Sequence, residues 1–218
     1  MTYLKFTELN LLTNIVCKMY SIEKIKKVLT NKGYVWFNDE VEKNFDVNIV
    51  GIRNSATGDK VTNLFDDILT ISYKEKGEWK YLEFEITTEA GKKGVLEFHN
   101  NLGVARLIPN QYRGAYSIAL HRGEYEALCQ RKPVAVWRDK NKDLIFDESP
   151  IIYRGLFGIN IHRSNPKTQS TFVENWSEGC QVFKKVADFN KFMDICKKAV
   201  KIHGNSFTYT LITSNDLV

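Results

Sequence analysis

Two short segments, Gly158-Ile159-Asn160-Ile161-His162-Arg163-Ser164 and Trp176-Ser177-Glu178-Gly179-Cys180-Gln181-Val182, carry the strongest signal in this chain. The first is an apolar run that ends in His162, which predicts a strand delivering an imidazole to its rim. The second contains a Ser-x-Gly-Cys turn, which presents the sulfur of Cys180 on a tight bend. A nucleophilic thiol needs a nearby base, and His162 precedes Cys180 by eighteen residues. The two segments therefore predict a Cys–His pair.

This pattern resembles the L,D-transpeptidase catalytic domain family (the YkuD fold), whose signature is a His, a loop and then Ser/Thr-His-Gly-Cys. The resemblance places the catalytic cysteine at Cys180 and its paired imidazole at His162. It implies that the backbone carbonyl of Arg163 orients the imidazole. Gly179 matches the signature glycine, and Ser177 matches the Ser/Thr, which implies a substrate-binding role.

The chain departs from the family at two positions. Glu178 stands where the family has a second His, and we expect it to have a recognition or structural role. Val182 stands where the family has an Arg that meets a substrate carboxylate. The candidate replacements for that arginine are Arg163, Arg154 and Arg113.

A second, weaker part of the resemblance lies upstream of the Cys–His pair. Pro109 followed by Gly114-Ala115-Tyr116-Ser117-Ile118 resembles the family's Pro-x-Gly-x-Tyr-x-Ile segment with extra residues inserted. In the family this strand helps to form a wall of the active site, which implies that Tyr116 binds substrate. The resemblance is strong over residues 158–182, weak over residues 108–118 and absent before about residue 48.

Hydrophobic periodicity predicts a mainly β fold with peripheral helices. The resemblance implies that this fold is an L,D-transpeptidase-like β-sandwich or barrel. Residues 1–46 are expected to form an N-terminal helical segment, and residues 47–218 the catalytic domain. Ser21 is a plausible N-cap for a docking helix over residues 21–29, and a second amphipathic helix is expected over residues 188–202. Strands are expected over residues 48–53, 68–73, 79–87, 94–98, 115–120, 133–138, 151–153 and 207–212.

Composition limits the function classes. The net charge of +5 suits an anionic surface such as a cell-wall polymer, a membrane or nucleic acid. No arginine-rich arm, zinc-finger spacing or aromatic RNA-binding signature is present, so no nucleic-acid partner is expected. No segment has the eighteen or so apolar residues of a membrane span, and residues 9–16 are not a convincing secretory signal. A wall substrate would then be reached by release at lysis, by an injection device or on a phage particle.

The remaining cysteines and histidines are assigned structural or surface roles. Cys129 and Cys196 are expected to be buried, and Cys17 cannot be interpreted. His121 and His99 lack a partner motif and are expected to be surface or structural residues, and His203 a cation at a helix C-terminus.

No cofactor and no metal site are predicted. Residues 139–147 resemble a calcium loop in the spacing of their oxygen-bearing side chains, but Leu144 and Pro150 replace its glycine and its last acidic residue. Asp and Asn are also ordinary turn residues between strands, which is the favoured interpretation.

The resemblance implies a cysteine peptidase that cleaves peptidoglycan stem peptides through an acyl-enzyme, as a phage endolysin does. The backbone N–H groups of Gly179 and Cys180 would hold the oxyanion. Two alternatives remain open. The first is an L,D-transpeptidase that forms peptidoglycan cross-links. The second is a non-catalytic wall-binding or phage-particle protein, which the changes at Glu178 and Val182 favour and the retained Cys180–His162 pair disfavours.

Overall fold

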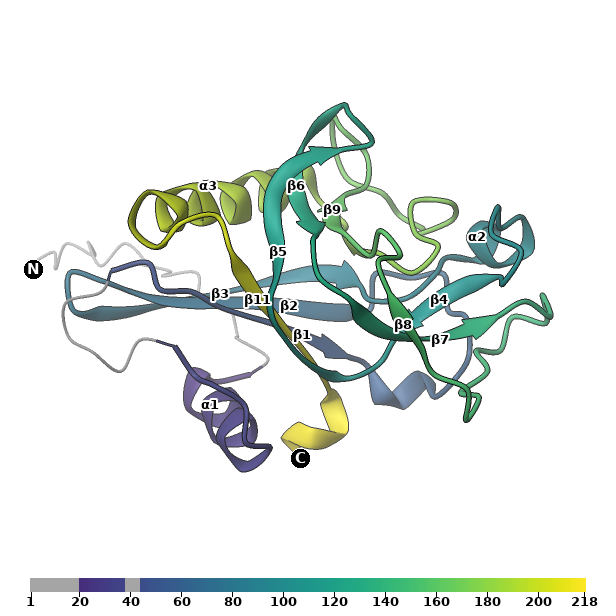
Figure 1. The fold of residues 1–218 in the computed structure, drawn as a ribbon, viewed down its shortest axis with the longest axis horizontal. Helices are drawn as coiled ribbons and strands as arrows, with labels where there is room; N and C mark the ends of the chain where they lie inside the picture. Colours follow the sequence, from purple (N-terminus) through teal and green to yellow (C-terminus); the bar gives the residue numbers. More distant parts are fainter. Residues whose placement is uncertain (1–19, 38–43) are drawn as a thin grey trace, which may run out of the picture.

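A closed barrel of eight strands forms the body of the protein in a computed structural model that describes residues 20–37 and 44–218. The order of strands around the barrel is β1-β11-β5-β6-β9-β10-β3-β2 (Figure 1). The expectation of a mainly β fold with peripheral helices is confirmed. The barrel strands are β1 (Asn48–Arg53), β2 (Asp67–Glu75), β3 (Glu78–Thr87), β5 (Asn110–His121), β6 (Tyr125–Gln130), β9 (Ile161–Arg163), β10 (Gln181–Phe183) and β11 (Phe207–Thr213).

The β2–β3 hairpin is the longest regular part of the barrel. Its two-residue turn is Lys76-Gly77, and both residues have positive φ, 54° and 82°. A turn of this kind has the twist that joins two antiparallel strands without splaying them, and glycine adopts positive φ at little cost. The turn therefore joins the two strands predicted over residues 68–73 and 79–87 into one hairpin.

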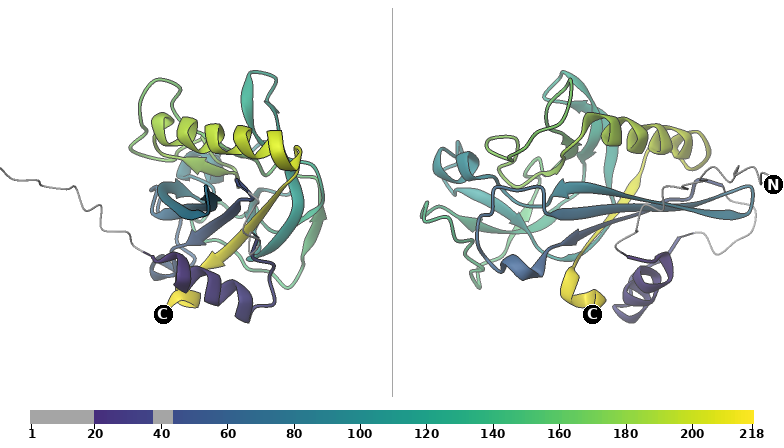
Figure 2. Two further views of the ribbon diagram at one scale, coloured as in Figure 1. Left: turned by 90° about the vertical axis from the view of Figure 1, so that its left-hand side faces the viewer. Right: turned by 180° about the vertical axis from the view of Figure 1, so that it is seen from behind.

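Two helices cover opposite sides of the barrel (Figures 1 and 2). In α1 (Ile22–Asn31), the side-chain oxygen of Ser21 accepts the Lys24 N–H at 3.2 Å, which confirms the predicted N-cap. Ile25 and Leu29 of α1 pack against the outward-facing apolar residues of β1 and β11. On the other side, α3 (Val186–His203) contributes Phe192 and Cys196 to the barrel core.

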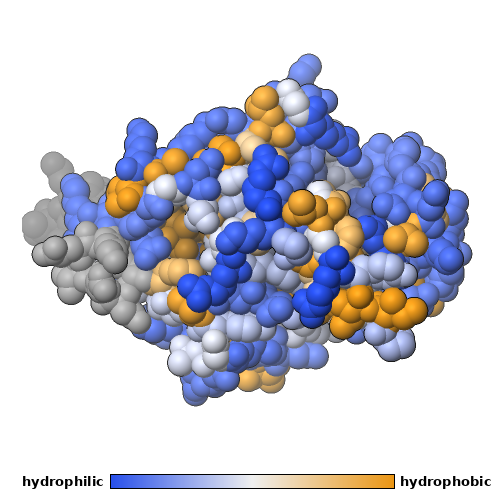
Figure 3. Space-filling view, in the orientation of Figure 1, coloured by the Kyte–Doolittle hydropathy of each residue, from blue (hydrophilic) through white to orange (hydrophobic). Residues whose placement is uncertain are grey.

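A small second sheet adjoins one end of the barrel. It consists of β4 (Val104–Leu107), β7 (Val134–Asp139) and β8 (Tyr153–Gly155), in the order β4-β7-β8. The Ala105 N–H donates to the Glu178 carbonyl at 3.0 Å and so joins β4 to the loop before Cys180. Ile151, Ile152 and Leu156 flank β8 and are exposed. Figure 3 shows hydrophobic atoms gathered on the side where β7 and β8 lie in Figure 1.

Some predicted elements differ from the structure. Residues 94–98, expected to be a strand, belong in part to the short helix α2 (Lys92–Leu96). Gly94 packs so closely on the loop before Cys180 that a Cβ there would lie 2.4 Å from the Ser177 carbonyl oxygen. The short helices η1 (Ser55–Thr57) and η2 (Ser214–Leu217), and strands β4, β6 and β10, were not predicted. Cys17 and residues 9–16 lie outside the described residues.

Candidate active site

Strand pairing places Cys180 and His162 on one face of the barrel wall. Strands β9 and β10 are parallel, with Val182 opposite His162 and the Gln181 N–H donating to the Asn160 carbonyl at 2.9 Å. Since side chains alternate along a strand, Cys180 lies on the same side as Val182 and His162. Ile161 and Phe183 face the barrel core instead. Both Cys180 and His162 line one cavity of about 370 Å³.

The proton position on His162 is fixed by its neighbour. Its Nδ1 lies 2.8 Å from the backbone carbonyl oxygen of Arg163, and a carbonyl oxygen only accepts. Nδ1 therefore carries the proton, and the lone pair lies on Nε2. Nε2 has no hydrogen-bond partner in the described part of the chain and is not one of the buried unpaired atoms, so it opens toward the cavity. The Arg163 carbonyl therefore lies where it can orient the imidazole, as the resemblance implies.

The resting thiol and imidazole are both uncharged near neutral pH. The Cys180 Sγ donates to the Gly158 carbonyl at 3.3 Å and accepts the Asn160 N–H at 3.5 Å. No hydrogen bond joins Sγ to His162 among the described residues, and such contacts often tighten only when substrate binds. Burial raises the pKa of Cys180 to about 11. Burial, together with the neighbouring His121, lowers the pKa of His162 to about 3.

The turn before Cys180 requires a glycine. Gly179 has a φ of 132°, and a Cβ there would lie 2.3 Å from the Ala105 carbonyl oxygen. Ser177 Oγ accepts the Gly179 N–H at 3.0 Å and donates to the Cys180 carbonyl at 2.9 Å. Only one of the two expected oxyanion donors is thus available, because the Gly179 N–H is already used. The Cys180 N–H has no hydrogen bond within the described ranges.

Of the five predicted substrate-binding residues, only Glu178 lines the cavity. Its carboxylate accepts a hydrogen bond from Nδ1 of the exposed His99 at 2.8 Å. The prediction for Ser177 is corrected, because this buried side chain shapes the turn. Tyr116 is also corrected, because it is 1% exposed and packs edge-on against Tyr209 inside the barrel.

The three arginines proposed to meet a carboxylate do not reach the cavity. Arg154 and Arg113 are exposed on β8 and β5, and the Arg163 guanidinium lies 3.9 Å from the ring centre of Tyr125. The cavity is lined instead by Arg122 and Arg138, which sequence reasoning missed. No local pattern distinguishes these two from the other arginines of the chain.

Arg138 is a partly buried cation without a carboxylate partner in the described structure. Its guanidinium lies 4.8 Å from the centre of the Phe157 ring, and its Nη1 donates to the Gly103 carbonyl at 3.1 Å. Its Nε is buried and has no hydrogen-bond partner in the part of the chain described. Burial lowers the pKa of this guanidinium, yet an arginine stays protonated near neutrality. The cavity wall thus offers an uncompensated positive charge.

His121 is a third cavity residue that sequence reasoning missed. It is 6% exposed, and its ring stacks on that of His162 with centroids 4.2 Å apart and planes inclined by 20°. Of the two roles expected for His121, surface or structural, its burial excludes the surface one, whereas His99 is exposed as expected. The interpretations of Cys129 and Cys196 as buried thiols are confirmed.

Gln130 holds the loop that carries the sulfur's hydrogen-bond partners. Its side-chain Nε2 donates to the carbonyls of Lys132 and Gly155 at 2.9 and 2.8 Å. Its Oε1 accepts the N–H groups of Phe157 and Ile159, each at 3.0 Å. All the hydrogen-bonding capacity of this buried amide is used to fix the loop that leads to Asn160.

We expect Gln130→Leu to lower the free energy of unfolding by on the order of 3 kcal/mol, because buried backbone groups lose their partners. Urea denaturation of the variant measures this loss. The matched control is Gln169→Leu, because Gln169 is exposed. Equal stabilities of the two variants would contradict the role assigned to Gln130.

The Asp139–Asp147 segment is organised as turns. Asp139 accepts the Asn141 N–H at 3.2 Å, and Asn141 accepts the Asp143 N–H at 3.1 Å. Within residues 20–37 and 44–218, no group of three or more His, Cys, Asp or Glu side chains is placed to hold a metal ion.

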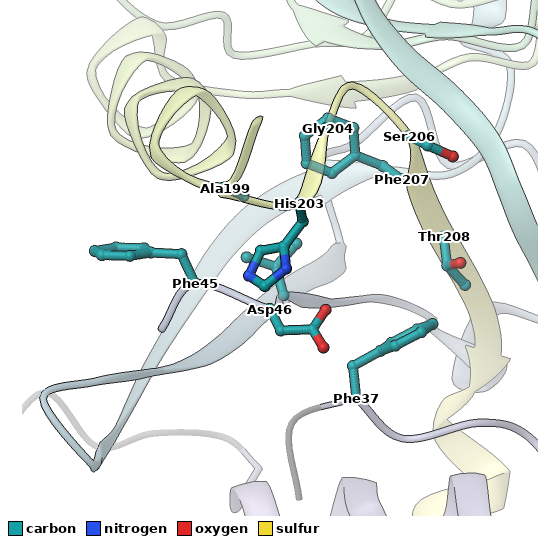
Figure 4. Close-up of a pocket in the computed structure, with 10 residues that line it drawn as sticks. Phe37, Phe45, Asp46, Ala199, His203, Gly204, Ser206, Phe207 and Thr208 are labelled. Carbon is teal, nitrogen blue, oxygen red and sulfur yellow. The ribbon is translucent and has the colours of Figure 1, made fainter. Parts of the chain in front are cut away.

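A second cavity, of about 60 Å³, lies away from the thiol (Figure 4). The close-up shows the His203 ring, at the end of α3, directed into the space between Phe45 and Phe37. His203 donates from Nε2 to the Asn44 carbonyl at 2.8 Å. This cavity is lined by the hydroxyl groups of Ser206 and Thr208 but by no thiol, so we assign the chemistry to the larger one.

The described helices include none that is both long and apolar enough to cross a membrane. Comparisons of the chain with family models, curated proteins and solved structures found no match.

Proposed function

We propose that this protein is a cysteine peptidase that cleaves peptidoglycan stem peptides through an acyl-enzyme. One observation carries the proposal: Cys180 and His162 line the same cavity, and the Arg163 carbonyl leaves the His162 lone pair on Nε2. A nucleophile, a base and a group that orients the base are the parts that acyl transfer needs. The resemblance of residues 158–182 to L,D-transpeptidases supplies the substrate class.

The reaction would start from the uncharged thiol and imidazole. As Sγ bonds to the peptide carbonyl carbon, the thiol proton passes to Nε2 of His162, and the oxyanion accepts the Cys180 N–H. Collapse of this intermediate breaks the C–N bond, and His162 protonates the departing amine. Water then attacks the thioester, and His162 takes a proton from the water. Collapse of this second intermediate breaks the C–S bond, His162 returns its proton to the sulfur, and the product leaves as a carboxylic acid that ionises in water.

A stem peptide is anionic, and the cavity wall carries the positive charges of Arg122 and Arg138. Its free carboxylate would meet Arg138, whose charge has no carboxylate partner in the described structure. The net charge of +5 also favours approach to an anionic polymer. Val182, the family's position for this arginine, is 0% exposed and cannot meet a substrate.

Arg138→Leu is expected to raise KM for a stem tetrapeptide about 10- to 100-fold, because a charge-assisted hydrogen bond is lost. A peptide amidated at its C-terminal carboxylate should bind the variant and the wild type about equally. Arg154→Leu is the control, since Arg154 is exposed and lies outside the cavity. A similar KM in Arg138→Leu and wild type would remove Arg138 from substrate recognition.

Digestion of purified peptidoglycan, followed by mass spectrometry of the fragments, tests the proposal. We expect soluble fragments whose new carboxyl ends show hydrolysis. Adding an amine acceptor to the same reaction would reveal cross-linked products if transpeptidation prevailed. Binding without any product would instead support a non-catalytic wall-binding protein.

A further inference from the structure

His121 occupies a position that the mechanism above does not use. It is the last residue of β5, and it lines the cavity that contains Cys180 and His162. Its ring lies face to face with that of His162, and Tyr125 packs against its side with ring centroids 5.4 Å apart. An imidazole at this place is within the reach of anything bound in the cavity.

The proton of His121 can be assigned from its neighbour. The Asn160 Oδ1 accepts the Gln130 N–H at 2.9 Å, which orients the amide. The Asn160 Nδ2 therefore faces the His121 Nδ1, at 3.0 Å. An amide NH₂ only donates, so the His121 Nδ1 accepts and the neutral ring carries its proton on Nε2.

The Nε2–H group of His121 opens to the cavity. It has no hydrogen-bond partner among the described residues, and it is not one of the buried unpaired atoms. The stacked rings thus present two Nε2 atoms of opposite character. The Nε2 of His162 carries a lone pair and can accept a proton, whereas the Nε2 of His121 carries a proton and can donate a hydrogen bond.

His121 also stays uncharged while His162 works. Burial and the charges of Arg122 and Arg163 together lower the pKa of His121 to about 4, against the opposing effect of Glu124. Proton transfer from the thiol charges His162, and a second charge on the stacked ring would be repelled. His121 is therefore a neutral donor throughout the reaction.

We infer that His121 is a second catalytic imidazole, which donates a hydrogen bond from Nε2 to a carbonyl oxygen of the bound peptide. The inference rests on the proposed function, because it needs the peptide in this cavity. His121 transfers no proton. It withdraws electron density from the carbonyl and supplements the single backbone donor, the Cys180 N–H, that the turn leaves available.

Two substitutions separate this role from a merely structural one. His121→Phe keeps a stacking ring without a donor, and we expect it to lower kcat about 100-fold with little change in KM. His121→Gln retains an N–H donor and should lose about 10-fold or less. Iodoacetamide should alkylate Cys180 at similar rates in both variants. Full activity of His121→Phe, or equal losses in the two variants, would overturn the inference.

Nitrogen-15 NMR of histidine-labelled protein supplies a readout besides activity. At pH 7, His121 should be the neutral Nε2–H tautomer, and a proton on Nδ1 would refute the inference. A stem tetrapeptide added to Cys180→Ala should shift the Nε2 signal of His121. Shifts at His162 without one at His121 would overturn this inference alone. No shift at either residue, with no cleavage by wild type, would overturn the proposed function and this inference with it.

Discussion

Cys180→Ala is expected to abolish release of peptidoglycan fragments while leaving the fold intact. The substitution removes the only thiol that the described structure places in the larger cavity. The Cys180 side chain is half-buried, and its sulfur makes only weak hydrogen bonds, to the Gly158 carbonyl at 3.3 Å and the Asn160 N–H at 3.5 Å. We therefore expect the free energy of unfolding to change by about 1 kcal/mol or less. Fragment release and urea denaturation measure the two effects.

Cys129→Ala is the matched control for the loss of a thiol. Cys129 is buried on β6, and its sulfur donates to the Ala119 carbonyl at 3.4 Å, away from the cavity. We expect this variant to retain cleavage. Wild-type activity in Cys180→Ala would exclude the proposed mechanism, whatever the behaviour of the control.

For His162→Ala, we expect the cleavage rate to fall by about two to four orders of magnitude, the usual range for a positioned acid–base group. The thiol would then have no acceptor for its proton, and burial already raises its pKa to about 11. Activity should recover in part as the pH rises and thiolate forms without help. The measurement is the pH dependence of kcat/KM for a stem peptide.

Alkylation of Cys180 should change much less than cleavage in His162→Ala. In the wild type the resting thiol bonds to the Gly158 carbonyl and not to His162, so the imidazole matters mainly once substrate is bound. His203→Ala is the control, because His203 lies at the end of α3 beside the smaller cavity. Equal cleavage rates in the two variants would mean that His162 is not the base.

Local periodicity was enough to predict the long elements of the fold. Alternation along residues 79–87 and the helical spacing in residues 188–202 persist over several turns or pleats, and both elements are found. Residues 94–98 are too few to show a clear period. In the structure they belong in part to helix α2, where Gly94 packs against the loop before Cys180. Strand β10 has three residues, and its pairing with β3 and β9 closes the barrel. Such non-local pairing leaves little trace in sequence.

The candidate site likewise has a part that local sequence predicts and a part that depends on non-local strand pairing. Cys180, His162 and the Arg163 carbonyl lie within one short stretch, so their residue types and spacing pointed to them. His121 and Arg138 come from β5 and β7, and they reach the cavity only because the barrel closes and the second sheet adjoins it. Tyr116 is the opposite case, a residue that local sequence wrongly placed at the site. Its segment matches the family's active-site strand, but in this barrel the side chain points into the core.

The hydrogen bond from the Cys180 sulfur to the Gly158 carbonyl affects how readily the thiol is oxidised. Peroxides attack thiolates far faster than thiols, and the first product is a sulfenic acid that can proceed to irreversible oxidation states. A sulfur that rests as a donor, with its pKa raised by burial to about 11, exposes almost no thiolate at neutral pH. The reactive form arises only during attack on substrate. If the protein acts on the cell wall as proposed, its nucleophile would stay reduced there without a reducing environment.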